Sequence, residues 1–123
     1  MLEQFAGVVV NDLRRLEGVV DQVAALLRGK RNLGPLERGQ VTIAYVALKA
    51  ELRRLRETGT VGGARRERTD SEERFYMPAV RMALIALRAP TSTNPLSSNW
   101  EAQLSEARTE ISYQLDRLER ELA

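Results

Sequence analysis

The fold is decided by residues 2–28, LEQFAGVVVNDLRRLEGVVDQVAALLR. Apolar residues recur in this stretch at alternating intervals of four and three: Leu2, Ala6, Val9, Leu13, Leu16, Val20, Val23 and Leu27. This spacing places one apolar row along one side of an α-helix. Further apolar residues (Phe5, Val19, Leu26) widen the row on one shoulder, as expected of a helix in a bundle rather than in a two-stranded coiled coil.

The next segment ends this helix, expected over residues 2–29, and begins a second one. Gly29 suits the position after a helix, because glycine readily adopts a positive φ. Pro35 suits the first position of a helix, where its missing N–H is not needed. The second helix is therefore expected over residues 35–57. Its part 41–50, VTIAYVALKA, is apolar on nearly all sides, so we expect it to lie deep in the core.

Residues 57–74, ETGTVGGARRERTDSEER, are the one long stretch without a helical pattern at its start. Three glycines in it make continued helix unfavourable, which predicts a flexible Gly/Arg-rich linker. A third helix is expected over 70–89, with a kink at Pro78 because proline cannot donate the helical hydrogen bond. A fourth helix is expected over 95–122, after a segment rich in proline and serine.

The sequence as a whole predicts an all-α fold, a four-helix bundle in a single domain spanning residues 1–123. No segment alternates apolar and polar residues between turn signals, as a half-buried strand would. A chain of 123 residues suits one domain. Its apolar content of 43% and charged content of 29% are typical of a soluble globular protein.

The composition excludes several classes of chemistry. The chain contains no cysteine and no histidine, which rules out Cys/His zinc sites, thiolate nucleophiles and Ser-His-Asp triads. We expect no cofactor and no metal. No apolar run approaches the twenty residues of a membrane span, and the first residues do not resemble a signal peptide, so we expect a cytoplasmic protein without membrane contact.

Metal-assisted hydrolysis remains chemically open, because carboxylates alone can hold Mg²⁺. The fourth helix carries Glu106 with Glu110, and Asp116 with Glu119, at helical spacing. These acids lie outside the apolar row of that helix, and we expect no acid in the apolar rows of the first three helices. A solvated acidic face is therefore the better interpretation, and we expect the protein not to be an enzyme.

The strongest charge feature lies at residues 49–68, which hold seven cations and three acids, a balance of +4. Arginine forks match phosphate and carboxylate oxygens, so six arginines are candidate contacts for an acidic ligand or partner: Arg53, Arg54, Arg56, Arg65, Arg66 and Arg68. The chain from Trp100 onward holds six acids and three arginines, a balance of −3. Three interpretations stay open: a solvated linker or charge complementarity within or between copies, an acidic protein partner, or nucleic acid.

Aromatic residues supply the remaining candidates. Phe75, Tyr76 and the adjacent Met77 form a run that cannot all face one core in a regular helix, and Tyr113 lies off the main apolar row. We therefore expect Phe75, Tyr76 and Tyr113 at an interface. The predicted function is a non-enzymatic protein-protein interaction module acting as a homodimer, such as a small regulator, inhibitor or assembly subunit encoded by a phage or mobile element. The alternative is a nucleic-acid-binding protein that contacts phosphates through the arginines of 53–68.

Overall fold

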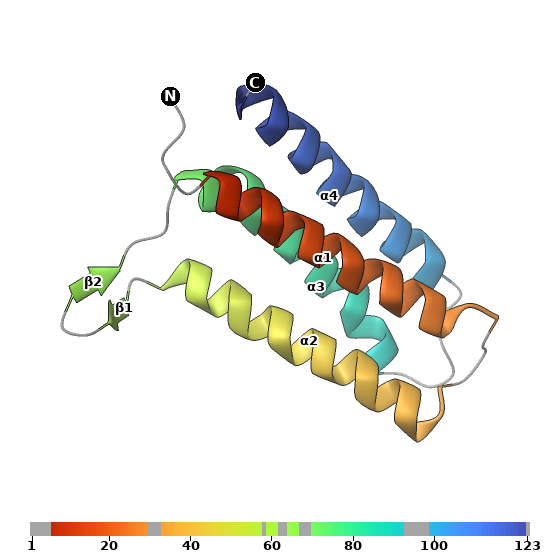
Figure 1. Cartoon of the computed structure of the whole chain (residues 1–123). Helices are drawn as coiled ribbons and strands as arrows, with labels where there is room; N and C mark the ends of the chain where they lie inside the picture. Colours follow the sequence, from red (N-terminus) through yellow and green to blue (C-terminus); the bar gives the residue numbers. More distant parts are fainter. Residues whose placement is uncertain are drawn as a thin grey trace.

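The described part of the chain forms four α-helices, and each runs in the opposite direction to the one before it (Figure 1). The structure, a computed structural model, describes residues 6–29, 33–57, 59–61, 64–66, 70–92 and 99–122. The helices are α1 (Ala6–Leu27), α2 (Pro35–Arg56), α3 (Met77–Ser92) and α4 (Trp100–Leu122). The predicted all-α fold of four helices is confirmed. The predicted helical residues 2–5 and 95–98 lie outside the described part of the chain.

The connection between α1 and α2 follows the predicted chemistry. Gly29 has a φ of 76°, a value that side chains with a Cβ rarely adopt, so glycine allows the chain to leave α1 there. Pro35 is the first residue of α2, after Gly34 in an extended conformation. Both turn predictions are confirmed.

The linker between α2 and α3 contains two short strands that the sequence did not predict. Strand β1 (Gly59–Val61) pairs with β2 (Ala64–Arg66) in antiparallel register, with Gly59 opposite Arg66. Strands of three residues are too short to show a clear alternation of apolar and polar residues, which is why the pattern search missed them. The flexibility of this linker stays a prediction.

The third helical segment begins with a π-helical turn, η1 (Glu72–Tyr76), that continues directly into α3. The N–H of Met77 donates to the carbonyl of Glu72, five residues earlier, instead of to the residue four earlier. Pro78 follows at once, and a proline in a helix lacks the N–H that the regular pattern requires. The irregular turn thus coincides with the predicted weak point, while a bend of the axis at Pro78 stays a prediction. Helix α3 passes its predicted end and includes Pro90.

The core combines one row from each helix with the residues of η1. The predicted row of α1 is buried from Val9 to Leu27, so this prediction is confirmed for the described residues. Helix α1 packs mainly on α4, and α3 packs on both α2 and α4. The turn η1 also contacts α1 and α4.

The prediction for residues 41–50 of α2 is wrong. Only Val41 and Leu48 are buried in this part, whereas Ile43 and Val46 are exposed. The physical reason is that α2 packs against α3 but makes few contacts with α1. In Figure 1, α2 lies on one side of α1 and α4 lies on the other, and among the described elements α2 packs mainly on α3.

Candidate functional site

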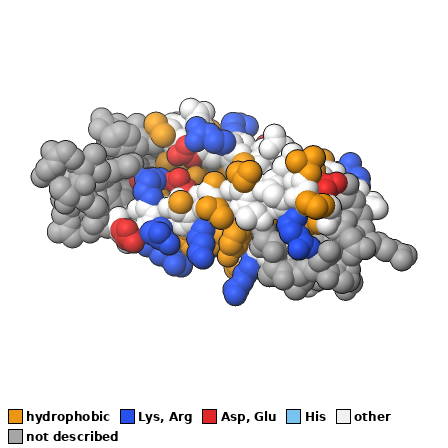
Figure 2. Space-filling view, turned by 90° about the horizontal axis from the view of Figure 1, so that it is seen from below, with side chains coloured by type: hydrophobic (Ala, Val, Ile, Leu, Met, Phe, Trp, Pro, Cys, Tyr) orange, Lys and Arg blue, Asp and Glu red, His pale blue; other side chains and the backbone are white. Residues whose placement is uncertain are grey.

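Helix α2 carries a second apolar row on the side that faces away from the bundle. Five residues at intervals of three and four form this row, which we call the outer row: Leu36, Gly39, Ile43, Val46 and Ala50. Leu36 is 74% exposed, Ile43 72% and Val46 56%, and the two small residues are exposed as well. The intervals are those of a heptad seam, the pattern by which helices pack on one another. Figure 2 shows apolar side chains gathered on the side of the molecule where α2 lies.

The outer row lies almost opposite the row that holds α2 to the bundle. That inner row consists of Val41, Leu48, Leu52 and Leu55, all buried. At 3.6 residues per turn, the mean directions of the two rows differ by about 170°. A methyl group added at Gly39 would meet nothing within 4 Å, so the middle of the outer row is open. The helix therefore has one face for folding and one that nothing in the described chain covers.

A groove runs beside α2 where it faces α1. It has a volume of about 390 Å³ and is lined by Gln22, Val23, Leu26, Gln40 and Ala44. Its floor is apolar and its amides lie on both helices. The groove exists because α1 and α2 make few contacts with each other, and it adds apolar surface next to the outer row.

Basic residues flank the C-terminal half of the outer row. Lys49, Arg53 and Arg56 are exposed, and Figure 2 shows cations along the edge of the apolar surface. The Lys49 ammonium lies 6.0 Å from the centre of the Tyr45 ring. Within the described residues neither Arg53 nor Arg56 has an ion-pair partner. Two of the six predicted arginines are therefore available to a ligand or partner.

Arg54, a third candidate, is already engaged inside the protein. Its guanidinium donates to Glu51 one turn earlier and, at 2.9 Å, to Glu72 of η1. Although burial alone lowers the pKa of this guanidinium, the hydrogen bonds to the two carboxylates raise it above its ordinary value. The Glu72 side chain is only 6% exposed. Arg54 is thus a structural residue, and the expectation that no acid lies in the buried rows of the first three helices is wrong.

Asp12 and Tyr76 lie close to this ion-pair network. Burial raises the pKa of the Asp12 carboxyl above its ordinary value of 3.8; the Arg15 guanidinium, 3.5 Å away, opposes this shift, and Glu51 adds to it. Burial also raises the pKa of the Tyr76 hydroxyl, and the carboxylates of Glu51 and Asp12 raise it further. These groups share one end of the bundle, where α1, α2 and η1 meet.

The remaining arginines of the linker are placed only in part. Arg65 and Arg66 belong to β2, opposite Thr60 and Gly59, and only their backbone is described. Arg68 lies outside the described residues. The structure thus brings Arg53 and Arg56 to the end of α2 that leads into the ribbon.

Among the described contacts, the acids of α4 do not pair with Arg53, Arg54 or Arg56. Glu119 accepts from Arg14 of α1 at 2.6 Å, and Glu121 accepts from Arg74 of η1 at 2.8 Å. The complementarity expected between the basic stretch and the acidic helix is therefore not made by Arg53 or Arg56 among the described contacts. Their charge remains directed outward.

The aromatic candidates divide into buried and exposed residues. Phe75 is fully buried and Tyr76 nearly so, and their burial removes both from the predicted interface. The centre of the Phe75 ring lies 4.8 Å from the guanidinium of Arg74 and 5.2 Å from that of Arg117. Tyr113 is 54% exposed on α4, with Arg117 at 5.5 Å from its ring. Only Tyr113 keeps an accessible surface.

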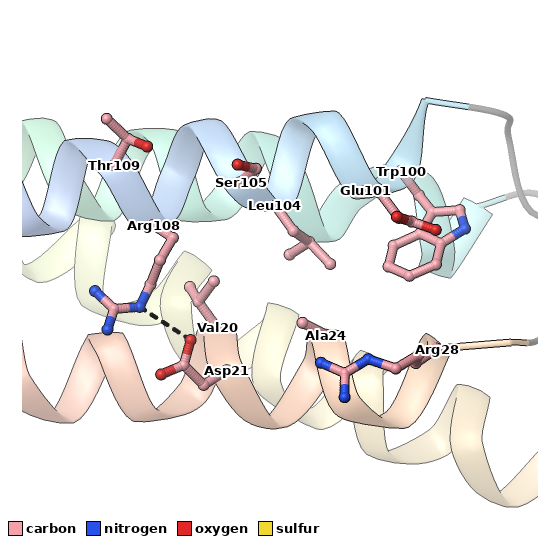
Figure 3. Close-up of a pocket in the computed structure, with 10 residues that line it drawn as sticks. All are labelled: Val20, Asp21, Ala24, Arg28, Trp100, Glu101, Leu104, Ser105, Arg108 and Thr109. Carbon is pink, nitrogen blue, oxygen red and sulfur yellow. Dashed lines mark hydrogen bonds and ion pairs between the residues drawn. The ribbon is translucent and has the colours of Figure 1, made fainter.

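A second cavity, of about 280 Å³, lies between α1 and α4 (Figure 3). Trp100 and Arg28 mark one end of it, and at the other end Arg108 donates to Asp21 at 2.9 Å. Arg108 also pairs with Glu17 and donates to Ser112. Two arginines and two acids line this cavity, so its charges balance and do not favour a ligand of either sign.

The outer row could have been found from the sequence, because residues 36, 39, 43, 46 and 50 show the same intervals of three and four as the first helix. Glu72 carries no such signal, since an acid at a helix start is ordinarily exposed. Its burial depends on contacts with distant parts of the chain.

Three further findings concern metal binding, membrane insertion and similarity to known proteins. Among the described residues, no three acidic side chains lie close enough together to hold a metal ion. None of the described helices combines the length and apolarity needed to cross a membrane. Comparison with known proteins gives no match to any family model, curated protein or solved structure.

Proposed function

We propose that the protein is a non-enzymatic protein-protein interaction module that works in the cytoplasm and docks a helix of its partner on the outer row of α2. The single observation that supports this proposal is the exposure of Leu36, Ile43 and Val46 in one heptad row. Burying three such side chains against a partner gains roughly 1.5–3 kcal/mol each, before the costs of association. Scattered exposed apolar residues are normal, but a row of them at helical spacing favours a docking face.

The surroundings of the outer row favour a particular partner surface. An amphipathic helix is the element whose spacing fits a heptad row, because its own apolar residues recur every three and four positions. The exposed cations Lys49, Arg53 and Arg56 favour acidic residues on the partner near one end of the row. The groove between α1 and α2 offers additional apolar area for a large side chain of that helix.

A photo-crosslinking experiment in the source cells tests the proposal. A benzophenone side chain at position 43 is expected to form discrete protein adducts, which the additional substitution Val46→Asp abolishes. Position 85 provides the matched control, since Ile85 is 61% exposed but lies on α3, outside the outer row. Equal adducts at both positions, or none at 43, would contradict docking on this face.

A second function, nucleic-acid binding, draws support from a different observation. Arg53 and Arg56 are exposed and unpaired within the described residues, and they lead into the strand that carries Arg65 and Arg66. Guanidinium groups along one end of a helix can contact successive phosphates. Against this, Arg54 is neutralised by Glu51 and Glu72, which leaves fewer cations than the sequence indicates.

A further inference from the structure

We infer that the occupant of the outer row is the outer row of a second copy of this chain, packed antiparallel, with the twofold axis between Ile43 and Val46. This inference rests on the proposed function and names the partner surface. It follows from the order of large, small and charged residues along α2. Heptad packing has two core positions, a and d, which alternate along the row. In an antiparallel pair, a residue at position a of one helix packs opposite a residue at position d of the partner helix.

The central contacts of such a pair are apolar. With the axis between residues 43 and 46, Ile43 of each copy packs on Val46 of the other, which joins the two exposed β-branched side chains of the row. These four side chains form the centre of the interface, where buried apolar contacts contribute most to affinity.

The next contacts outward are small on both sides. The same register places Gly39 of each copy opposite Ala50 of the other. Small residues allow two helix backbones to approach closely, and no described residue lies within 4 Å of a methyl group placed at Gly39. A parallel pair would instead place Gly39 against itself, which leaves a gap between the helices.

The ends of the row also fit an antiparallel pair. Helix α2 has Glu37 beside Arg38 in its first turn, whereas its last turn holds the exposed cations Arg53 and Arg56. Antiparallel packing keeps the basic ends of the two helices apart and brings Leu36 to the aliphatic stem of Arg53. The positive end of each helix macrodipole then lies beside the negative end of the other, which is a favourable arrangement. Parallel packing would bring the two basic ends together.

The size of this contact sets the expected affinity. The row from residue 36 to residue 53 extends over about 26 Å at 1.5 Å per residue. One helix pair of that length is smaller than a standard interface of about 1,600 Å². We therefore expect a dissociation constant in the micromolar range, about 1–100 μM.

The absence of cysteine from the chain makes a disulfide test direct. The variants Gly39→Cys and Ala50→Cys, carrying different tags, are mixed and oxidised. Mixed disulfides between the two variants are expected, and each variant alone should crosslink no more than the control Ile85→Cys, because identical positions lie about 16 Å apart along the axis. Disulfides of Gly39→Cys with itself, without mixed ones, would overturn the antiparallel arrangement.

Sedimentation equilibrium provides the second measurement. The unmodified protein should form dimers in the micromolar range, and Ile43→Asp should raise the dissociation constant by at least about tenfold, while Ile85→Asp leaves it unchanged. A dimer that tolerates Ile43→Asp would overturn the inference. A strict monomer would overturn it as well, but discrete adducts to another protein at position 43 would then still support docking on α2. A monomer without such adducts contradicts both proposals.

Discussion

Arg54 of α2 and Glu72 of η1 lie 2.9 Å apart, nitrogen to oxygen, and join the second helix to the start of the third segment. The acid is almost fully buried, and the same guanidinium also binds Glu51. This contact closes the end of the bundle from which the linker with β1 and β2 leaves. Arg54, which was predicted to contact a ligand, therefore stabilises the fold instead.

Replacing Arg54 by Met should destabilise the protein by about 1–3 kcal/mol, because Glu72 loses its guanidinium while it remains buried. Arg53→Met is the matched control, since Arg53 is the exposed neighbour in the chain and has no ion pair among the described residues. Its effect should stay within about 0.5 kcal/mol. Urea unfolding of both variants measures the difference. Equal stability of the two variants would show that the ion pair does not support the fold.

Replacing Asp12 by Asn should change how stability depends on pH. The pKa of Asp12 is raised in the folded protein, so the folded state holds its proton more tightly than the unfolded state. Its contribution to stability is therefore present below pH 3.8 and is lost as the pH rises through the folded pKa. Asp12→Asn removes this loss, so the variant should be more stable than the parent at pH 7, by less than about 1 kcal/mol because the pair with Arg15 is also lost.

Thermal unfolding between pH 3 and pH 8 measures this effect. The difference between Asp12→Asn and the parent should grow with pH and then level off. Asp116→Asn, which removes an exposed carboxyl on α4, serves as the control for the loss of one negative charge. A difference that shrinks as the pH rises has the opposite sign and would contradict the assignment.

Phe75→Ala should reduce stability by about 3–5 kcal/mol, because the ring is fully buried and leaves a cavity beside Arg74 and Arg117. Phe75→Leu should cost less, since it refills most of the volume. Tyr113→Ala removes an aromatic ring of similar size from an exposed position on α4, so its cost should stay below about 1 kcal/mol. Chemical denaturation of the three variants tests the distinction. A mild effect of Phe75→Ala would return this residue to the candidate interface.

Fluorescence anisotropy with a labelled DNA duplex separates the proposed function from its alternative. We expect weak binding at low salt that is lost near 150 mM, as for a protein with a net charge of only +2. The double variant Arg53→Gln with Arg56→Gln should then equal the parent at the higher salt. Tight binding by the parent, with a salt slope that falls by about 1.8 in the double variant, would instead assign both arginines to phosphates.

The buried side of the first helix was predictable because its apolar residues lie along one side of the helix. Only that side can be turned toward the core. The buried side of residues 41–50 was not predictable, because apolar residues on all sides indicate hydrophobicity without saying which side lacks a neighbour. Which side of α2 is exposed depends on the sparse packing between α1 and α2. The local sequence pattern does not predict this packing. The outer row was visible as a heptad, but its exposure was not.

The candidate contacts failed for similar reasons. Phe75 and Tyr76 were placed at an interface on the geometry of a regular helix, in which three consecutive side chains spread over more than half of the circumference. The π-helical turn changes that spacing, and contacts with α1 and α4 cover what remains, so all three residues of the run are buried. Arg53 and Arg54 are adjacent arginines that the sequence does not distinguish. Only Arg54 lies close enough to Glu72 to form an ion pair.

The two rows of α2 are subject to separate selection. A substitution at Val41, Leu48 or Leu52 changes the core and is tested by folding in every cell that makes the protein. A substitution at Leu36, Ile43 or Val46 leaves the core untouched, and under the proposed docking it is tested only when the partner is present. Over evolutionary time the outer row can therefore drift toward a new partner while the inner row keeps the bundle folded.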